Sequence, residues 1–209
     1  MLQPSDGEIL LDGVPVKRDR KGLTELRRRV GIVFQDPDDQ LFSADVYRDI
    51  SFGAVNLGLP EAEVRRRVEA AMERTGVSHL RDKPTHALSF GQKKRVAIAG
   101  VIAMAPRCIV LDEPTAGLDG RASLELIETL RNFAKEGMGI IHITHDIELA
   151  LELSAKILVL EEGRALSWGS PCETAALICE KNIKGLAVPE VLALAKRLKA
   201  VGKIESLAW

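Results

Sequence analysis

The sequence predicts an α/β fold in which a mostly parallel sheet is flanked by helices. After residue 107, short apolar runs of the kind found in buried strands alternate with helical patterns. A mostly helical block, residues 45–105, is inserted before this alternation. The 209 residues, 46% of them hydrophobic, suffice for one compact domain with a core. We therefore expect a single domain over 1–209, with a helical subdomain over 45–105 and a helical tail over 171–209.

The elements before residue 107 are marked by turn residues and apolar spacing. A short strand over 8–13 ends at an Asp-Gly pair, and a short basic helix over 24–29 follows. The apolar run 30–34 is a strand, which residues 35–37 end because they include a proline. A helix begins at Pro60, where a missing N–H costs little, and carries apolar residues every three to four positions.

The elements after residue 107 follow from an alternation of apolar runs and helical spacing. The nearly continuous apolar run over 108–111 predicts a strand buried on both faces. The expected strands are 108–111, 139–143, 157–160 and 164–168. The expected helices are 121–135, 147–153 and a final amphipathic one over 188–200.

Composition and charge exclude several classes of protein. A formal net charge of -1 gives no field that attracts nucleic acid, so we expect no nucleic-acid partner. Three cysteines without a C-x-x-C pair indicate a reducing compartment. The longest apolar run, 96–105, is far shorter than the ~20 residues that span a bilayer, and residues 1–6 do not resemble a signal peptide. A membrane role must therefore come through a membrane-embedded partner.

Two carboxylates follow the strand over 108–111. Ligands of open parallel sheets bind beyond the carboxyl ends of the strands, which is where Asp112 and Glu113 lie. Asp112 can hold Mg²⁺ there, partly through water, and Glu113 can polarise an attacking water molecule. Gln35, at the end of another strand, can reach the ion or the water. Taken alone, these residues also fit an acidic surface pair and a turn glutamine.

Two further positions suit a phosphate group. Ser89 is a good N-cap, and with Gly91 and Gln92 in the first turn it offers a hydroxyl, backbone N–H groups and the helix dipole to an anion. The basic residues 93–95 are expected to pack only through the aliphatic parts (the stems) of their side chains. His145, after the strand over 139–143, can hydrogen-bond a γ-phosphate. Each signal alone also fits a capped helix or a surface histidine, but their joint order favours phosphate chemistry.

In this order the motifs resemble the nucleotide-binding subunit of ABC transporters, which has a P-loop NTPase-like fold. Gln35 matches the Q-loop, 88–92 the signature, 108–113 the Walker B strand, 116–119 the D-loop and His145 the switch histidine. The resemblance implies ATP hydrolysis with ATP and Mg²⁺ as cofactors. The implied site residues are Glu113 and His145 for catalysis, Ser89, Gly91, Gln92 and Asp119 for the nucleotide, and Asp112 and Gln35 for Mg²⁺.

Segments 30–42, 49–53 and 91–100 look like the cobalt/nickel and energy-coupling-factor group of this family. In that group two ATPases drive a transmembrane coupling protein, which works with a substrate-binding membrane component. The resemblance implies an importer of cobalt, nickel or a vitamin, with this chain peripheral at the cytoplasmic face of the membrane. A second ATPase, identical or different, is the implied dimer partner. Gln40 and its neighbours would lie near the groove that receives the coupling helices.

Two features depart from the family pattern. Phe90 stands where the family most often has glycine. No G-x-x-x-x-G-K-[ST] phosphate loop, the Walker A motif, occurs in the sequence, and residues 3–13 resemble the segment that normally follows it. We therefore expect the isolated chain to be inactive. We also expect the sheet to lack a strand beside 108–111, which would expose apolar surface and lower solubility.

Three explanations of the absent phosphate loop stay open. Met1 could be an internal residue of a longer subunit, or the chain could be a partial one without activity. Alternatively, a degenerate subunit could lend only residues 89–92 to a partner's Walker A motif. A non-transport ABC ATPase is disfavoured, because only residues 36–87 separate Q-loop and signature and they carry no sustained heptads.

Overall fold

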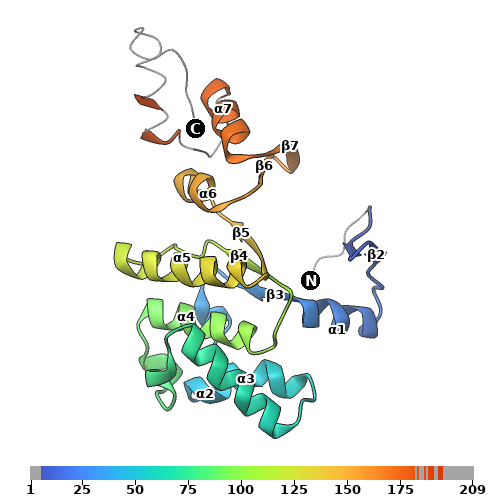
Figure 1. Ribbon diagram of the computed structural model, residues 1–209, viewed down its shortest axis with the longest axis vertical. Helices are drawn as coiled ribbons and strands as arrows, with labels where there is room; N and C mark the ends of the chain where they lie inside the picture. Colours follow the sequence, from blue (N-terminus) through green and yellow to red (C-terminus); the bar gives the residue numbers. More distant parts are fainter. Residues whose placement is uncertain (1–5, 182, 184–185, 187, 191–192, 195–209) are drawn as a thin grey trace. The chain divides into compact units, whose positions relative to one another are not determined.

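The computed structural model describes residues 6–181, 183, 186, 188–190 and 193–194 (Figure 1). The chain divides into two compact units, Met1–Ile143 and Thr144–Trp209, which are described separately below. Within the described ranges, no helix combines the length and apolarity that a bilayer span requires. The predicted subdomain and tail boundaries stay predictions.

The first unit contains the parallel sheet and the helical block. Its elements in chain order are β1 (Leu10–Leu11), β2 (Val14–Pro15), α1 (Arg20–Arg29), β3 (Val30–Val33), α2 (Val46–Asn56), α3 (Glu61–Arg74), α4 (Phe90–Ile102), β4 (Cys108–Asp112), α5 (Gly120–Lys135) and β5 (Gly139–Ile143). Short 3-10 helices cover Pro37–Asp39, Ser78–Leu80 and Thr85–Ala87. The predicted α/β architecture is confirmed.

The parallel sheet has the strand order β3-β4-β5. Val33 pairs with Leu111 and Asp112 pairs with Ile143, so the three carboxyl ends lie at one edge of the sheet. The expectation that 108–111 lacks a neighbouring strand is wrong, because β4 is the central strand and pairs on both sides. In β4, Ile109 and Leu111 are buried but Cys108 and Val110 are only half-buried, so the expectation that 108–111 is buried on both faces holds for one face only.

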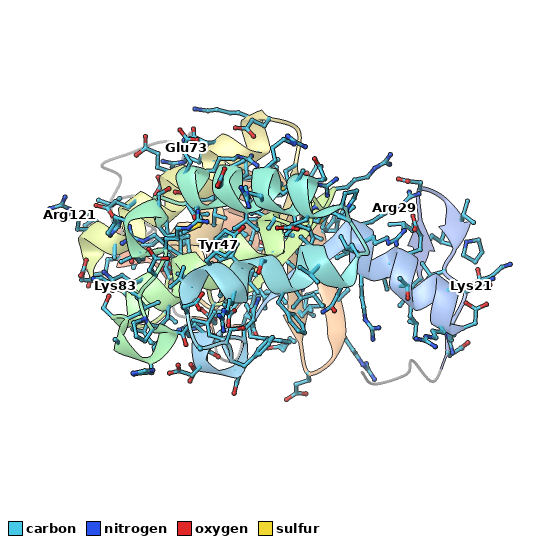
Figure 2. The ribbon with its side chains drawn as sticks, turned by 90° about the horizontal axis from the view of Figure 1, so that it is seen from below. Lys21, Arg29, Tyr47, Glu73, Lys83 and Arg121 are labelled. Atoms are coloured by element: carbon cyan, nitrogen blue, oxygen red, sulfur yellow. The ribbon has the colours of Figure 1, made fainter. Side chains whose placement is uncertain are left out.

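The core of this unit is formed by the sheet together with the helices α2, α3, α4 and α5. Helices α2, α3 and α4 pack against one another, and α4 packs on β3. Figure 2 shows α2, marked by Tyr47, beside α3, marked by Glu73. Side chains on facing surfaces are fully buried, among them Ile50 in α2, Val68 in α3 and Ile98 in α4, and Leu111 from the sheet joins the same core. At Gly31 in β3, an added Cβ would lie 2.2 Å from Val101 Cγ1 of α4. Helix α4 is therefore seated closely on the strand that leads to Gln35.

Glu63 in α3 is held by two arginines of the same helix. Its carboxylate accepts two bonds of 2.8 Å from Arg66 and one of 2.6 Å from Arg67. The Arg66 bonds, followed by the Arg67 bond, lower the pKa of Glu63 from 4.5 to about 2. A carboxyl group whose pKa is lower in the folded than in the unfolded state stabilises the fold above pH 4.5, and this stabilisation is lost as the pH falls towards 2.

We expect Glu63→Gln to lower the urea midpoint of unfolding at pH 6, because it removes the charge that both arginines bind. The difference from wild type should shrink steadily below pH 4.5. Urea titrations at a series of pH values measure this. Glu61→Gln is the control, because the Glu61 side chain is 92% exposed and its arginine lies 3.9 Å away. If the urea midpoint of Glu63→Gln stays below that of wild type by the same amount down to about pH 3, the prediction is contradicted.

The second unit contains α6 (Ile147–Leu153), β6 (Ile157–Glu161), β7 (Arg164–Gly169) and α7 (Pro171–Glu180). Strands β6 and β7 form an antiparallel hairpin whose two turn residues, Glu162 and Gly163, have φ values of 48° and 78°. Positive φ at both positions is typical of a tight hairpin turn. Buried residues from α6, β6 and α7 form a small separate core. The helix predicted over 188–200 falls mostly outside the described residues.

Candidate functional site

Asp112 and Glu113 lie where β4 ends. Asp112 is the last residue of the strand and is exposed. Glu113 has a φ of 43°, which is uncommon for a residue with a side chain and is enriched at functional sites. Its N–H donates to the carbonyl oxygen of Ile143 at 2.9 Å, so the turn after β4 is tied to the end of β5. This backbone turns the chain sharply at the carboxylate pair.

Gln35 lies at the same edge of the sheet as the two carboxylates. Because β3 and β4 are parallel and Val33 pairs with Leu111, Asp112 at the end of β4 and Gln35 just after β3 lie at the same edge of the sheet. The segment after Gln35 is bound to α4, since Lys93 forms an ion pair of 2.6 Å with Asp38. The strand order thus brings the three residues predicted for Mg²⁺ and water activation to one edge.

Ser89 is the N-cap of α4, as the sequence predicts. Its hydroxyl accepts a bond of 3.4 Å from the N–H of Gln92, and the Gln92 side-chain oxygen accepts one of 3.0 Å from the N–H of Ser89. This capping box occupies the carbonyl oxygen of the Gln92 side chain, so only its NH₂ group is left to donate to a ligand. Ser89 is exposed, and Gly91 and Gln92 are half-buried.

The loop before α5 packs on the first turn of α4. A Cβ added at Gly117, whose φ is 76°, would lie 2.8 Å from the Phe90 ring, and one added at Gly91 would lie 3.4 Å from Leu118. Asp119 caps α5, because its carboxylate accepts the N–H of Ala122 at 2.8 Å. The structure therefore brings the predicted signature and D-loop together. The capping role of Asp119 is one that sequence reasoning missed.

His145 belongs to the second unit and lies between two residues that fix the local backbone. Thr144 accepts the N–H of Asp146 at 3.0 Å, and Asp146 in turn caps α6 by accepting the N–H of Leu149 at 3.0 Å. The His145 side chain is exposed. The other seven predicted site residues all lie in the first unit.

Lys94 is the functional candidate that sequence reasoning missed. The expectation that residues 93–95 pack only through their stems is wrong, because all three side chains have polar partners in the structure. Lys94 is only 2% exposed, and its Nζ donates to the carbonyl oxygens of Glu113 at 2.7 Å and Pro114 at 2.9 Å. The sequence did contain a sign that Lys94 is buried. Its spacing places it on the same helix face as Ala97, Ile98 and Val101, which are buried.

A groove of about 460 Å³ opens between α2, α4 and the side of α1. Phe42 and Phe52 line it and are 65% and 49% exposed, with ring centroids 4.6 Å apart in an edge-on arrangement. Gln40 also lines the groove, and its amide NH₂ lies 3.5 Å from the Ala97 carbonyl oxygen on α4. Arg27 contributes the basic side of the opening. Most of the surface is apolar, which suits a protein partner.

Comparison with known proteins places this geometry in a family. The model of the ABC transporter family matches residues 1–116. An energy-coupling factor transporter ATP-binding protein of Clostridium perfringens is 55% identical over 84% of this chain and 62% of its own length. A cobalt import ATP-binding protein of Rhodobacter capsulatus is 48% identical over 93% of this chain and 69% of its own length.

Solved structures agree with these similarities. One described as cbiO1 of Clostridium perfringens, part of the ABC transporter complex cbiONQ, has a TM-score of 0.79 and 51% identity over 94% of this chain and 78% of that one. A dimeric ATP-binding cassette solved with ADP and phosphate has a TM-score of 0.71 at 24% identity, which supports the fold alone.

The chain belongs to the ATP-binding proteins of ABC transporters, in their energy-coupling-factor and cobalt-import group. The resemblance drawn from the motif order is therefore confirmed. The chain spans about 62% of the length of several curated relatives that it matches.

Proposed function

We propose that the chain is the ATP-hydrolysing subunit of an ABC importer, which couples ATP hydrolysis to the uptake of cobalt, nickel or a vitamin. The observation that carries this proposal is the position of Asp112 and Glu113. Asp112 ends the central strand of a parallel sheet and Glu113 follows it, at the edge where Gln35 also lies and where ligands of such sheets bind. The names of the relatives support the transport role.

In this proposal, the strand-end residues bind the ion and activate water. Asp112 and Gln35 supply carboxylate and amide oxygens, the ligands that Mg²⁺ prefers, so the residues present fit the ion. Bound Mg²⁺ neutralises charge on the phosphates. Glu113 accepts a proton from the attacking water or polarises it, and its turn is already fixed by the bond to Ile143. His145 donates to the γ-phosphate.

The start of α4 would contact the phosphates of a nucleotide held with a second ATPase subunit. Ser89 can donate its hydroxyl hydrogen, and the first-turn N–H groups around Gly91 and the NH₂ group of Gln92 add further donors. Asp119 adds a carboxylate at the start of the neighbouring helix. A second ABC ATPase, identical or different, is the proposed partner at this site.

The groove beside α2 would receive a helix of the transmembrane coupling protein. An amphipathic helix can lay its apolar face on Phe42 and Phe52, which are exposed and already in contact with each other. Through this partner the chain would sit at the cytoplasmic face of the membrane, and the substrate-binding membrane component would select the cargo.

Phosphate release by the complex reconstituted in liposomes tests the proposal. We expect turnover that falls by about 10²-fold or more when EDTA removes Mg²⁺, because the phosphate charge is then unneutralised. The chain alone is expected to show no turnover. Release that is insensitive to EDTA, or equally fast when the chain is left out of the complex, contradicts the proposal.

A further inference from the structure

The ammonium group of Lys94 is buried and yet has a defined set of partners. The residue is 2% exposed, in the second turn of α4. Placing a lysine in such a position costs free energy unless its N–H groups are bonded. Nζ donates to two successive carbonyl oxygens, those of Glu113 and Pro114. The two bonds are 2.7 and 2.9 Å long, so two hydrogen bonds of ordinary length hold the ammonium group in one position.

The two carbonyls belong to the turn that carries Glu113. This residue has a left-handed backbone with φ of 43°, a conformation that persists only where the surroundings hold it. The Glu113 N–H is bound on one side by the Ile143 carbonyl. Lys94 binds its carbonyl on the other side. Both peptide groups that flank the Glu113 Cα are therefore fixed by atoms outside the turn.

Electrostatics and packing support the same contact. Burial lowers the pKa of Lys94 from 10.5, while the charges of Glu113, Asp36 and Asp112 oppose that shift. The ring of Phe90, one turn earlier on α4, has its centroid 5.5 Å from Nζ, and the same ring covers Gly117. Phe90 thus lies beside the ammonium group. The residue that departs from the family pattern is part of this contact.

We propose that Lys94 is a positioning residue for the hydrolysis of ATP, which holds the turn after β4 so that the Glu113 side chain is presented to the attacking water. This role rests on the proposed function. Lys94 itself touches neither water nor nucleotide in the proposal; it acts through the backbone of Glu113 and Pro114. It also joins α4, whose N-cap is Ser89, to the turn that follows Asp112.

Lys94→Met tests this role because methionine fills a similar volume without a donor. In the reconstituted complex, we expect kcat for ATP to fall roughly 10- to 100-fold with KM within about twofold, since a displaced catalytic group slows chemistry more than binding. Amide hydrogen exchange in 113–118 should quicken, while the melting temperature stays close to wild type. Lys94→Gln, which keeps an NH₂ donor, should recover part of kcat.

Lys135→Met is the matched control, because Lys135 is exposed at the end of α5. It should leave kcat and exchange in 113–118 unchanged. A wild-type kcat in Lys94→Met, or a loss that Lys94→Gln reproduces in full, overturns the positioning role. If instead the complex with Glu113→Gln turns over ATP as fast as the wild-type complex, the proposed function itself fails, and the role of Lys94 fails with it. The exchange measurement on the free chain separates that case from a failure of the lysine contact.

Discussion

Replacing Glu113 by glutamine is expected to lower ATP turnover of the reconstituted complex by about 10²–10⁴-fold, the usual effect of losing a general base. Glutamine keeps the size of the side chain and a carbonyl oxygen but cannot accept the proton. The backbone of the turn should survive, because its bonds to Ile143 and Lys94 use main-chain atoms of residue 113. Nucleotide affinity should therefore change little, and phosphate release measures the loss.

Glu162→Gln is a matched control for this prediction. Glu162 is also a glutamate with positive φ, at 48°, but it lies in the β6–β7 turn. Turnover should stay at the wild-type value. Full activity of Glu113→Gln contradicts the assignment of the base. If Ser89→Arg abolishes activity while Glu113→Gln leaves it intact, the chain is instead a degenerate subunit that contributes only the start of α4.

Replacing Phe52 by aspartate is expected to detach the chain from its membrane partner. A large apolar residue that lines a docking groove commonly contributes ~2 kcal/mol or more to binding, so its loss lowers affinity roughly 30-fold. Aspartate also places a charge where an apolar helix face would lie. Phe52 is 49% exposed, so the substitution leaves the core intact. Co-purification with the transmembrane partner in detergent measures the effect.

Val55→Asp controls for a charge on the same helix. Val55 is 56% exposed on α2 but does not line the groove. This variant should co-purify like wild type, and both variants should keep the wild-type melting temperature. Equal loss of the partner in both variants would contradict a docking site centred on the groove. Normal association of Phe52→Asp would place the partner elsewhere.

Local patterns predicted most of the elements but not how the strands are ordered. The apolar runs over 30–34, 108–111 and 139–143 became β3, β4 and β5 because each has strand length and is bounded by turn residues. Sheet order depends on contacts far apart in sequence, so the prediction that 108–111 lacks a neighbour was wrong. Capping residues such as Ser89 were predictable, because a cap bonds only to its own first turn.

The contacts that shape the candidate site are the part that local patterns could not predict. Lys94 binds carbonyls 19 and 20 residues away, and nothing near it in the sequence marks it as buried apart from its helix face. The packing of Phe90 on Gly117 likewise joins segments that only the fold brings together. The motif order predicts which residues carry chemistry, and the fold shows which contacts hold them in place.

The nucleotide bound to the purified complex tests the central claim most directly. After incubation with ATP and Mg²⁺ and removal of free nucleotide, chromatography of the extract separates ATP from ADP. We predict ADP in the wild-type complex and retained ATP in the Glu113→Gln complex, because binding survives while hydrolysis stops. ADP in both complexes would contradict the claim that this chain hydrolyses ATP with Glu113.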